Sequence, residues 1–304
     1  MFSAIVSPNN PRVKNAAQLK ESKNRRREGL FLVDGVREVL RAWVSDFEFV
    51  EVFWDAGRNL DADERVEVDA VLESVYSDFE RRENLRRILI EADGRGVPTI
   101  PLSSNAFEKL SFGDRDEGVI AVVKSKLRTL DELGSLLAEK RKTEGEEPLL
   151  GIVEGVEKPG NIGAMLRSGD GAGLDAFIIA GDNFDVFNPN AIRGSLGAIF
   201  HMPIVVAPAD ETLAWLRERK IQRATALCDE AIPYVQIDYR LPTAIILGSE
   251  AQGLSEAWAC ETVEDAKYSL LQRIRLPMLG IADSLNVSNA AAILFYEARR
   301  VRSY

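Results

Sequence analysis

The stretch LLGIVEGVEKPGNIGAMLRSGDGAGLDAFIIAG, residues 149–181, decides the fold class of this chain. It begins with a short apolar run, passes through a turn into a helical stretch, and ends in a second apolar run. Short continuous apolar strands joined by helices are typical of a parallel sheet that is covered on both faces. The same pattern recurs downstream in HMPIVVAP, IQRATALC and TAIILGS, before the apolar closing helix SLNVSNAAAILFYEARRVR. We therefore expect a mostly parallel α/β sheet over residues 149–304.

The first 125 residues predict a second, smaller α/β domain. Extended patterns alternate there with helical ones, which indicates an α/β sandwich. The extended runs are GLFLVDG, FEFVEVFW, VPTIPLS and GVIAVVK, and the helical ones are RVKNAAQLKESKNRRREG, VREVLRAWV and the charged region 61–94. Residues 126–148 are expected to form a helix and a solvated linker, with the domain boundary at KTEGEEP, 142–148.

Composition excludes several classes of protein. The net charge of -10 argues against a general nucleic-acid coat, although it leaves room for a local basic patch. A single histidine, His201, weighs against catalytic triads and most zinc hydrolases, and two cysteines cannot build a disulfide framework or a cysteine zinc site. No window approaches about eighteen consecutive apolar residues, and the amino terminus has no signal-peptide pattern. We expect no membrane span and a cytoplasmic location.

The loop EKPGNIGAMLR, 157–167, is the first of three candidate ligand-binding loops, because parallel sheets bind ligands at the carboxyl ends of their strands. Asn161 suits a helix N-cap. Gly163 lies one helical turn before Arg167, which predicts that something approaches the backbone there. A capped helix with a surface arginine explains the same residues and stays open as an alternative.

The second and third loops follow later apolar runs. LGSEAQGL, 247–254, has Gly248 and Gly253 around a carboxylate, Glu250, although a simple strand-to-helix turn would look similar. In RLPMLGIADSLNVS, 275–288, an extended stretch passes into the closing helix, with Ser284 and Asn286 around its start. These two residues are either helix caps or part of a pocket wall.

Two further patterns are interpreted as structural. The glycines in GDGAG, 169–173, resemble a dinucleotide fingerprint, but they lie at a helix end, so we interpret them as helix termination. Asp175, Asp182 and Asp185 are clustered without a neighbouring histidine, and we interpret them as solvated loop acids. We expect no metal.

Taken together and in this order, the three loops resemble the three motifs of the SpoU (TrmH-like) family of RNA ribose 2'-O-methyltransferases, in the knotted SPOUT superfamily. The intervening NPNAIRGSLG, 188–197, resembles the family's middle segment, and RRREGLFLVDG, 25–35, resembles its ribosomal-protein-like substrate-binding domain more loosely. The chain departs from the family pattern at Asp34, Asp170 and Asn289, and in a long segment over 254–273. The departure at Asp170 concerns the packing of its helix.

The resemblance implies a deep trefoil knot that holds S-adenosylmethionine, a homodimer, and RNA held partly by the amino-terminal domain. It implies a catalytic set of Arg167, Asn161, Glu250, Ser284 and Asn286. It implies cofactor contacts from Gly248, Gly253, Leu276, Met278, Gly280 and Leu285. Methyl transfer from a sulfonium requires alignment and charge stabilisation rather than a metal, which agrees with the composition.

A basic cluster near the amino terminus is expected to bind RNA phosphate groups. Its members are Lys20, Lys23, Arg25, Arg26, Arg27 and Arg37. A solvated surface explains the same cluster without RNA. The substrate is predicted to be ribosomal or transfer RNA. Two other functions are weighed: a non-catalytic RNA-binding protein on the same fold, and a Rossmann-type dehydrogenase, whose glycine fingerprint is missing.

Overall fold

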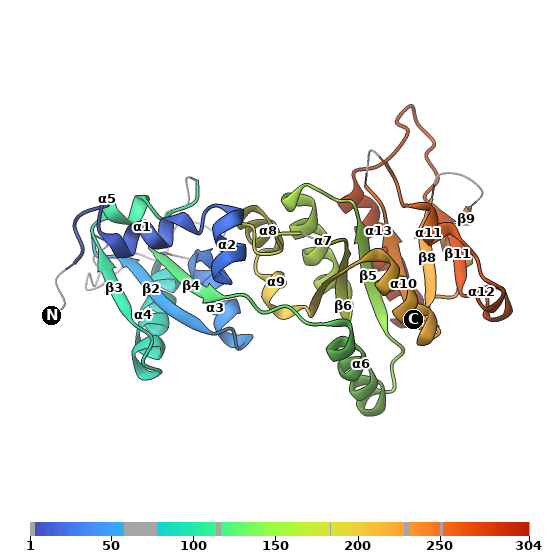
Figure 1. Cartoon of the computed structure of the whole chain (residues 1–304), viewed down its shortest axis with the longest axis horizontal. Helices are drawn as coiled ribbons and strands as arrows, with labels where there is room; N and C mark the ends of the chain where they lie inside the picture. Colours follow the sequence, from blue (N-terminus) through green and yellow to red (C-terminus); the bar gives the residue numbers. More distant parts are fainter. Residues whose placement is uncertain are drawn as a thin grey trace, which may run out of the picture. The chain divides into compact units, whose positions relative to one another are not determined.

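The computed structural model describes residues 4–57, 78–113, 117–182, 184–227, 231–249 and 252–303 (Figure 1). Contacts divide the chain into two compact units. One unit comprises Met1–Lys126 with Phe187–Pro189, and the other comprises Leu127–Val186 with Asn190–Tyr304. Within the described ranges, no helix combines the length and the apolar character that crossing a bilayer requires.

A mixed four-stranded sheet forms the first unit. Its strands lie in the order β1-β4-β2-β3, where β4 pairs antiparallel with β1 and β2, and β3 pairs parallel with β2. The four extended runs predicted in this region are confirmed as these strands. The elements are α1 (Pro11–Gln18), α2 (Ser22–Glu28), β1 (Leu30–Asp34), α3 (Val36–Val44), β2 (Phe49–Asp55), α4 (Asp78–Gly94), β3 (Thr99–Leu102), α5 (Ser104–Glu108) and β4 (Val119–Lys124).

The helix predicted from RVKNAAQLKESKNRRREG is two helices, α1 and α2. Side chains from α2 fold back on the break: Asn24 Nδ2 donates to the carbonyl of Gln18 at 2.9 Å. Arg25 Nη1 donates to the carbonyls of Leu19 and Lys20 at 2.6 and 2.7 Å. These carbonyls lie at and just after the end of α1, where the helical pattern of N–H donors stops. The side chains, together with the N–H of Glu21 on the carbonyl of Gln18, replace the missing helical hydrogen bonds.

The second unit contains a seven-stranded sheet whose recorded pairings are all parallel among the described residues. The strand order is β7-β6-β5-β10-β8-β11-β9. The five apolar runs predicted as strands are confirmed as β5, β6, β7, β8 and β10. The elements are α6 (Leu130–Glu144), β5 (Leu149–Glu154), α7 (Pro159–Ala172), β6 (Ala176–Ala180), α8 (Pro189–Ser195), α9 (Ala198–His201), β7 (Ile204–Ala207), α10 (Ala209–Glu218), β8 (Gln222–Ala226), β9 (Ile232–Pro233), η1 (Tyr234–Gln236), β10 (Thr243–Leu247), α11 (Glu256–Ala259), α12 (Val263–Tyr268), β11 (Leu271–Arg275) and α13 (Val287–Ser303).

Helices cover both faces of this sheet. Alternate strand residues such as Ile152 and Ile246 join Leu133 of α6 and Leu216 of α10 in one apolar cluster. The remaining strand positions face the other way, where α13 packs against α7 and β10. Because α6 contributes to this cluster, the helix expected within residues 126–148 packs into the second unit.

Arg223 of β8 anchors the long segment between β10 and β11 through a buried charge cluster. It is fully buried, and its Nη2 lies 2.7 Å from Asp265 Oδ1 in α12. Arg217 of α10 lies 3.1 Å from the other oxygen of the same carboxylate. Asp265 also accepts hydrogen bonds from the N–H and hydroxyl of Thr262, which closes the capping box of α12. The long segment is therefore fixed to β8 and α10.

Candidate functional site

A pocket of about 520 Å³ lies at the carboxyl edge of the parallel sheet. It is bounded by the ends of β8, β10 and β11 and by the first turns of α13. Its volume falls within the range of roughly 300–1,000 Å³ that is usual for small-molecule sites. Six of the predicted residues line it: Gly248, Gly253, Leu276, Met278, Ser284 and Leu285.

The loop after β10 folds back on itself beside this pocket. Ser249 and Gly253 exchange backbone hydrogen bonds of 3.2 and 2.9 Å, and Gly253 has a φ of +68°. A Cβ on Gly248 would lie 2.1 Å from the carbonyl carbon of Gly253. Only glycine fits at position 248, because the loop's own main chain occupies the space of a side chain.

The same loop is tied to the neighbouring strand β5. Glu154, at the end of β5, accepts hydrogen bonds from Ser255 through both carboxylate oxygens, at 2.7 Å from the N–H and 2.9 Å from the hydroxyl. The side chain of Ser249 also packs near Gly155, whose own φ is +67°. The loops after β5 and β10, predicted separately from sequence, therefore lie together.

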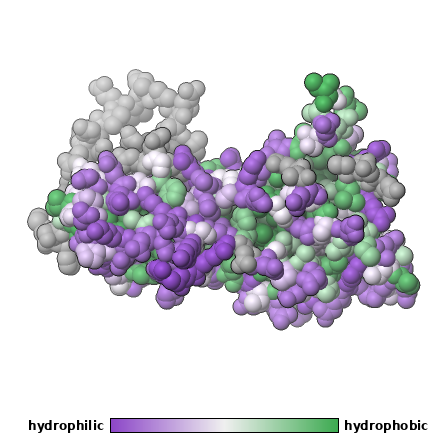
Figure 2. All heavy atoms as spheres, turned by 45° about the horizontal axis from the view of Figure 1, so that its top comes forward, coloured by the Kyte–Doolittle hydropathy of each residue, from purple (hydrophilic) through white to green (hydrophobic). Residues whose placement is uncertain are grey.

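The loop after β11 combines a pocket wall with an exposed tip. Leu276, Met278 and Leu285 line the pocket, whereas Leu279 and Ile281 are almost completely exposed. Figure 1 shows this loop projecting between β11 and α13, and Figure 2 shows hydrophobic surface at its tip. Gly280 does not line the pocket, and a Cβ there would meet nothing within 4 Å, so no close approach requires this glycine.

Of the two residues around the start of the closing helix, one is a helix cap and the other is part of the pocket wall. Asn286 Oδ1 accepts hydrogen bonds from the N–H and hydroxyl of Ser288 at 2.9 and 2.6 Å, so it caps α13. Ser284 lines the pocket. The helix begins at Val287, three residues later than the predicted start.

The prediction that Asn161 is an N-cap is wrong. The first helix of the motif, α7, begins at Pro159, and Lys158 occupies the N-cap position. Proline is favoured in the first helical turn because it has no N–H to leave unsatisfied there. Asn161 instead lies inside α7, and its Oδ1 is 3.4 Å from Nδ2 of Asn286. This amide pair brings the first and third motifs together.

Gly163 and Arg167 lie one turn apart on α7, but Gly163 is buried and Arg167 is exposed. A Cβ on Gly163 would lie 2.5 Å from the carbonyl oxygen of Ala191 and 2.9 Å from the N–H of Ser195. The element that approaches this glycine is therefore α8. Arg167 is exposed and does not line the pocket.

Asp170, further along α7, pairs at 2.7 Å with Nδ1 of the exposed His201, so this departure from the family pattern faces outward.

The pocket also contains residues that sequence reasoning did not single out. Ala226 and Leu227 at the end of β8, Ser249, and the charged residues Arg275 and Asp283 line it. Ala226 and Leu227 were missed because β8 lies between β10 and β11 in the sheet, and the order of strands in a sheet is not visible in the order of the chain.

Glu250 lies outside the described residues. Within the described ranges, no three His, Cys, Asp or Glu side chains are grouped to hold a metal.

The amino-terminal basic residues fall into two structural groups. Lys23, Arg26 and Arg27 are exposed. Arg25 is only 4% exposed and is bonded to main-chain carbonyls.

Lys20 and Arg37 are also engaged within the unit. Lys20 is part-buried, donates to the carbonyl of Ser111 at 2.7 Å, and has its pKa lowered by burial despite the charge of Asp34. Arg37 pairs with the buried Glu38 at 2.6 Å. Arg25 and Lys20 therefore stabilise the fold of this unit.

Comparison with known proteins places this geometry among methyltransferases. The model of the SpoU rRNA Methylase family matches residues 148–296, and that of the MRM3-like substrate binding domain matches residues 10–121. The chain is 30% identical to a 23S rRNA (guanosine-2'-O-)-methyltransferase of Bordetella pertussis, over 76% of this chain and 90% of the relative. It is 29% identical to a 23S rRNA (uridine(2479)-2'-O)-methyltransferase of Streptomyces viridochromogenes, over 98% of this chain and 92% of the relative.

A solved structure is similar to this chain over nearly its full length. The SpoU methyltransferase AviRb from Streptomyces viridochromogenes, in complex with the cofactor AdoMet, superposes with a TM-score of 0.73 at 27% identity. The match covers 97% of this chain and 99% of that structure.

Proposed function

The chain belongs to the SpoU rRNA methylase family, and from this premise we propose that it methylates a ribose 2'-hydroxyl in 23S ribosomal RNA, with S-adenosylmethionine as the methyl donor. One observation carries the proposal: the pocket at the carboxyl edge is built from the second and third family motifs, and the first motif is bonded to the third through Asn161 and Asn286. Both relatives are 23S rRNA ribose methyltransferases, which supports 23S ribosomal RNA as the substrate.

The pocket fits S-adenosylmethionine. The folded-back loop at Gly248 and the stretch after β11 offer main-chain groups and apolar side chains, which suit an adenosine and an alkyl chain. Gly248, Leu276, Met278 and Leu285 would hold the cofactor there. Membership in the family also supports the predicted trefoil knot in this unit.

Bound S-adenosylmethionine supplies a methyl group on a sulfonium, which is already a good leaving group. The chain must then orient the ribose and stabilise the negative charge that develops on its oxygen. Asn161 and Asn286 present neutral amides at the meeting point of two motifs. Arg167 supplies a permanent positive charge, because a guanidinium stays protonated in proteins. Its role is to bind phosphate or the activated hydroxyl rather than to remove a proton.

RNA capture is assigned to the exposed basic residues of the first unit. Lys23, Arg26 and Arg27 are exposed on α2, on a chain whose net charge is -10. A match to a substrate binding domain over residues 10–121 supports this assignment.

The active form is proposed to be a homodimer. Exposed apolar side chains occur on α13 at Ile293 and Tyr296, and on the loop tip at Leu279 and Ile281. A second copy of the chain would remove these from water.

Methyl transfer to defined RNAs tests the proposed function. Purified protein with S-[methyl-³H]adenosylmethionine is incubated with unmodified 23S rRNA, 16S rRNA and bulk transfer RNA, and the methylated position is mapped by its resistance to alkaline cleavage. We expect incorporation into one ribose of 23S rRNA. Labelling of transfer RNA alone, or labelling of a base, would overturn the proposal.

A further inference from the structure

A second cavity, of about 460 Å³, lies at the amino edge of the same parallel sheet. Pro148, Ile221 and Pro242 border it, and each precedes one of the neighbouring strands β5, β8 and β10. Because the S-adenosylmethionine pocket lies at the carboxyl ends of β8 and β10, the two cavities are at opposite edges of the sheet. They have no lining residue in common in the described part of the chain.

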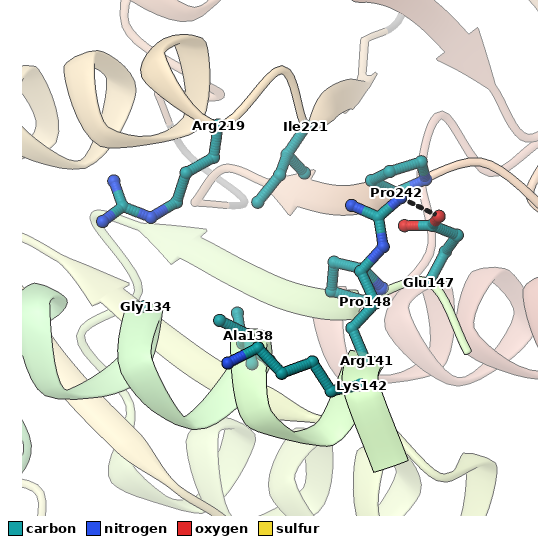
Figure 3. A pocket seen from close by; sticks show the side chains of 10 residues that line it. Gly134, Ala138, Arg141, Lys142, Glu147, Pro148, Arg219, Ile221 and Pro242 are labelled. Atoms are coloured by element: carbon teal, nitrogen blue, oxygen red, sulfur yellow. Dashed lines mark hydrogen bonds and ion pairs between the residues drawn. The ribbon is translucent and has the colours of Figure 1, made fainter. Parts of the chain in front are cut away.

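One face of α6 forms the opposite wall of this amino-edge cavity. Its lining residues recur at helical spacing: Gly134, Leu137, Ala138, Arg141 and Lys142. Apolar atoms of this wall and of Ile221, Pro148 and Pro242 make a hydrophobic interior (Figure 3). Long cationic side chains surround it, with Arg219 near Gly134 and Arg141 near Glu147 (Figure 3).

The lining carries three cations and one carboxylate, Glu147. Glu147 pairs with Arg141 at 2.5 Å. Two further acids lie outside the lining. Arg219 Nη1 donates to a carboxylate oxygen of Glu218 at 2.8 Å, and a carboxylate oxygen of Glu139 lies 3.8 Å from Nζ of Lys142. These acids use one edge of each cation and leave further N–H donors, since a guanidinium has five and an ammonium three. The cavity itself therefore presents an excess of donors with positive charge.

The side chain of Arg219 is held in place by two neighbours, Trp215 and Gly134. Its guanidinium lies 4.6 Å from the ring centroid of Trp215. It also packs against Gly134: a Cβ there would lie 2.7 Å from Nη2 and 3.0 Å from Nε. Glycine destabilises a helix interior relative to alanine, so its presence within α6 needs a physical reason. Gly134 supplies one, because it leaves room for the Arg219 guanidinium.

We propose that the amino-edge cavity binds a nucleoside monophosphate unit. Its phosphate would lie against Arg141 and Lys142, and its base against the proline and aliphatic surface, with the base carbonyl oxygens toward Arg219 at the Gly134 end of the cavity. A cavity of 460 Å³ is far larger than a bare phosphate needs and is in the range of sites for drug-sized ligands. The unit comes either from an RNA chain or from a free mononucleotide. This proposal goes beyond methyl transfer and does not depend on it.

Calorimetric titration of the full chain with uridine and guanosine 5'-monophosphates tests the free source. Saturating S-adenosylhomocysteine is present throughout, so that nucleotides cannot bind in the cofactor pocket. Arg219→Gln and Arg141→Gln are compared with Arg300→Gln. The control is matched, because Arg141 and Arg300 are each 61% exposed and each is paired with a glutamate.

A second arm measures binding of single-stranded RNA oligonucleotides to the same four proteins. We expect dissociation constants to rise at least fivefold for both cavity variants in at least one arm, with no change for Arg300→Gln. An effect on mononucleotides identifies a free nucleotide, and an effect on RNA alone identifies an RNA segment. Equal binding by the wild type and both cavity variants in both arms would overturn the proposal.

Gly134→Ala separates ligand binding from a structural role of Arg219. The new methyl group must displace the guanidinium, while alanine favours the helix. We expect an undiminished melting temperature together with weaker nucleotide binding. A variant that binds as well as the wild type would contradict the proposed part of Arg219. Methylation of ribosomal RNA, assayed separately, reports on the proposed function alone.

Discussion

Arg167 brings a guanidinium group to the end of the first motif, and guanidinium groups carry a positive charge in proteins. Its side chain is exposed on α7 and lies outside the cofactor pocket lining. We predict that Arg167→Ala lowers methyl transfer by roughly a hundredfold or more, the scale expected when a group that stabilises developing charge is removed. Binding of S-adenosylhomocysteine should be unchanged in calorimetry, because the cofactor pocket is intact.

The control for this prediction is Arg240→Ala, which removes an exposed arginine just before β10, at the other edge of the sheet. If Arg167→Ala turns over at close to the wild-type rate, measured with tritiated cofactor, Arg167 has no catalytic role. The other interpretation of the first loop, a capped helix with a surface arginine, would then be correct.

Gly248 gives a second prediction at the scale of one residue. Because its missing Cβ leaves room for the main chain at Gly253, Gly248→Ala must open the folded-back loop beside the pocket. We expect the affinity for S-adenosylhomocysteine to fall at least tenfold, while circular dichroism shows an unchanged fold. Gly160→Ala is the matched control, since a Cβ at Gly160 meets nothing within 4 Å. Equal affinities for both variants would show that the loop is not part of the site.

The individual roles of residues were harder to predict than their place in a motif. The sequence predicts a close approach at Gly163 and a ligand-binding loop at Gly248, but the groups that approach these two glycines are α8 and the loop itself. Asn161 was assigned to a cap and instead bonds Asn286, 125 positions away in the chain. Sequence spacing shows that a small or polar residue is needed, whereas its partner is set by tertiary packing.

At the scale of elements, α13 connects the cofactor pocket with distant parts of the unit. Its first turn lines the pocket, and near its other end Arg299 donates to the carbonyls of Ala172 and Gly173 at the end of α7. Arg302 donates to the carbonyls of Tyr239, Pro148 and Leu241. Cations at the carbonyl end of a helix are electrostatically favourable. The carboxyl end of the helix that bears the pocket wall is thereby held in place.

The Asp265 carboxylate gives a prediction for the segment between β10 and β11. Burial opposes its ionisation, but hydrogen bonds from Thr262 and the charge of Arg223 outweigh burial and lower its pKa. Asp265→Asn leaves the buried Arg223 without its counter-charge. Removing one partner of a buried ion pair costs about 3–5 kcal/mol. We expect a loss of that order in the free energy of unfolding, measured by urea denaturation.

Asp238→Asn is the comparison, because it breaks an exposed pair with Arg240. Exposed pairs are screened by water, so this loss should be much smaller. If the two variants lose equal stability, the buried cluster does not fix α12 to β8. The pH dependence should follow the same group: a lowered pKa gives stability that is present at neutral pH and is lost as the pH falls through the acid range.

Elements differed in how well the sequence predicted them. Strands with continuous apolar runs, such as β5 and β10, were found because burial on both faces leaves a clear pattern. The short helices α11 and α12 were missed, since a helix of one or two turns has little periodicity. The break between α1 and α2 depends on the Asn24 and Arg25 side chains, which look like ordinary helix surface in a sequence.

At the scale of the whole molecule, the assembly state is the first open prediction. On the apolar closing helix α13, Val287, Leu294 and Phe295 are buried within one chain, while Ile293 and Tyr296 are exposed. We predict a homodimer of about 67 kDa, twice the chain mass of 33.7 kDa, in light scattering at micromolar concentration. A Tyr296→Glu variant should shift the equilibrium toward monomer. A wild-type mass equal to one chain would exclude the dimer.

The last prediction concerns how an acidic chain captures RNA. With a net charge of -10, attraction to phosphate must come from a local cluster rather than from the whole surface. Lys23, Arg26 and Arg27 are exposed together on α2, whereas Arg25 is buried and must be kept for folding. Each phosphate contact contributes about 0.7 units to the slope of log affinity against log salt on single strands and about 0.9 on duplex.

Replacing Lys23, Arg26 and Arg27 together by alanine should therefore flatten that slope by about two units, because each lost contact releases one counterion fewer. Cofactor affinity should stay the same, since the pocket residues belong to the other unit. The control triple removes Arg240, Lys267 and Arg300, exposed cations of the second unit, and has the same change in net charge. If both triples flatten the slope equally, RNA responds to overall charge, and the α2 cluster is only a solvated surface.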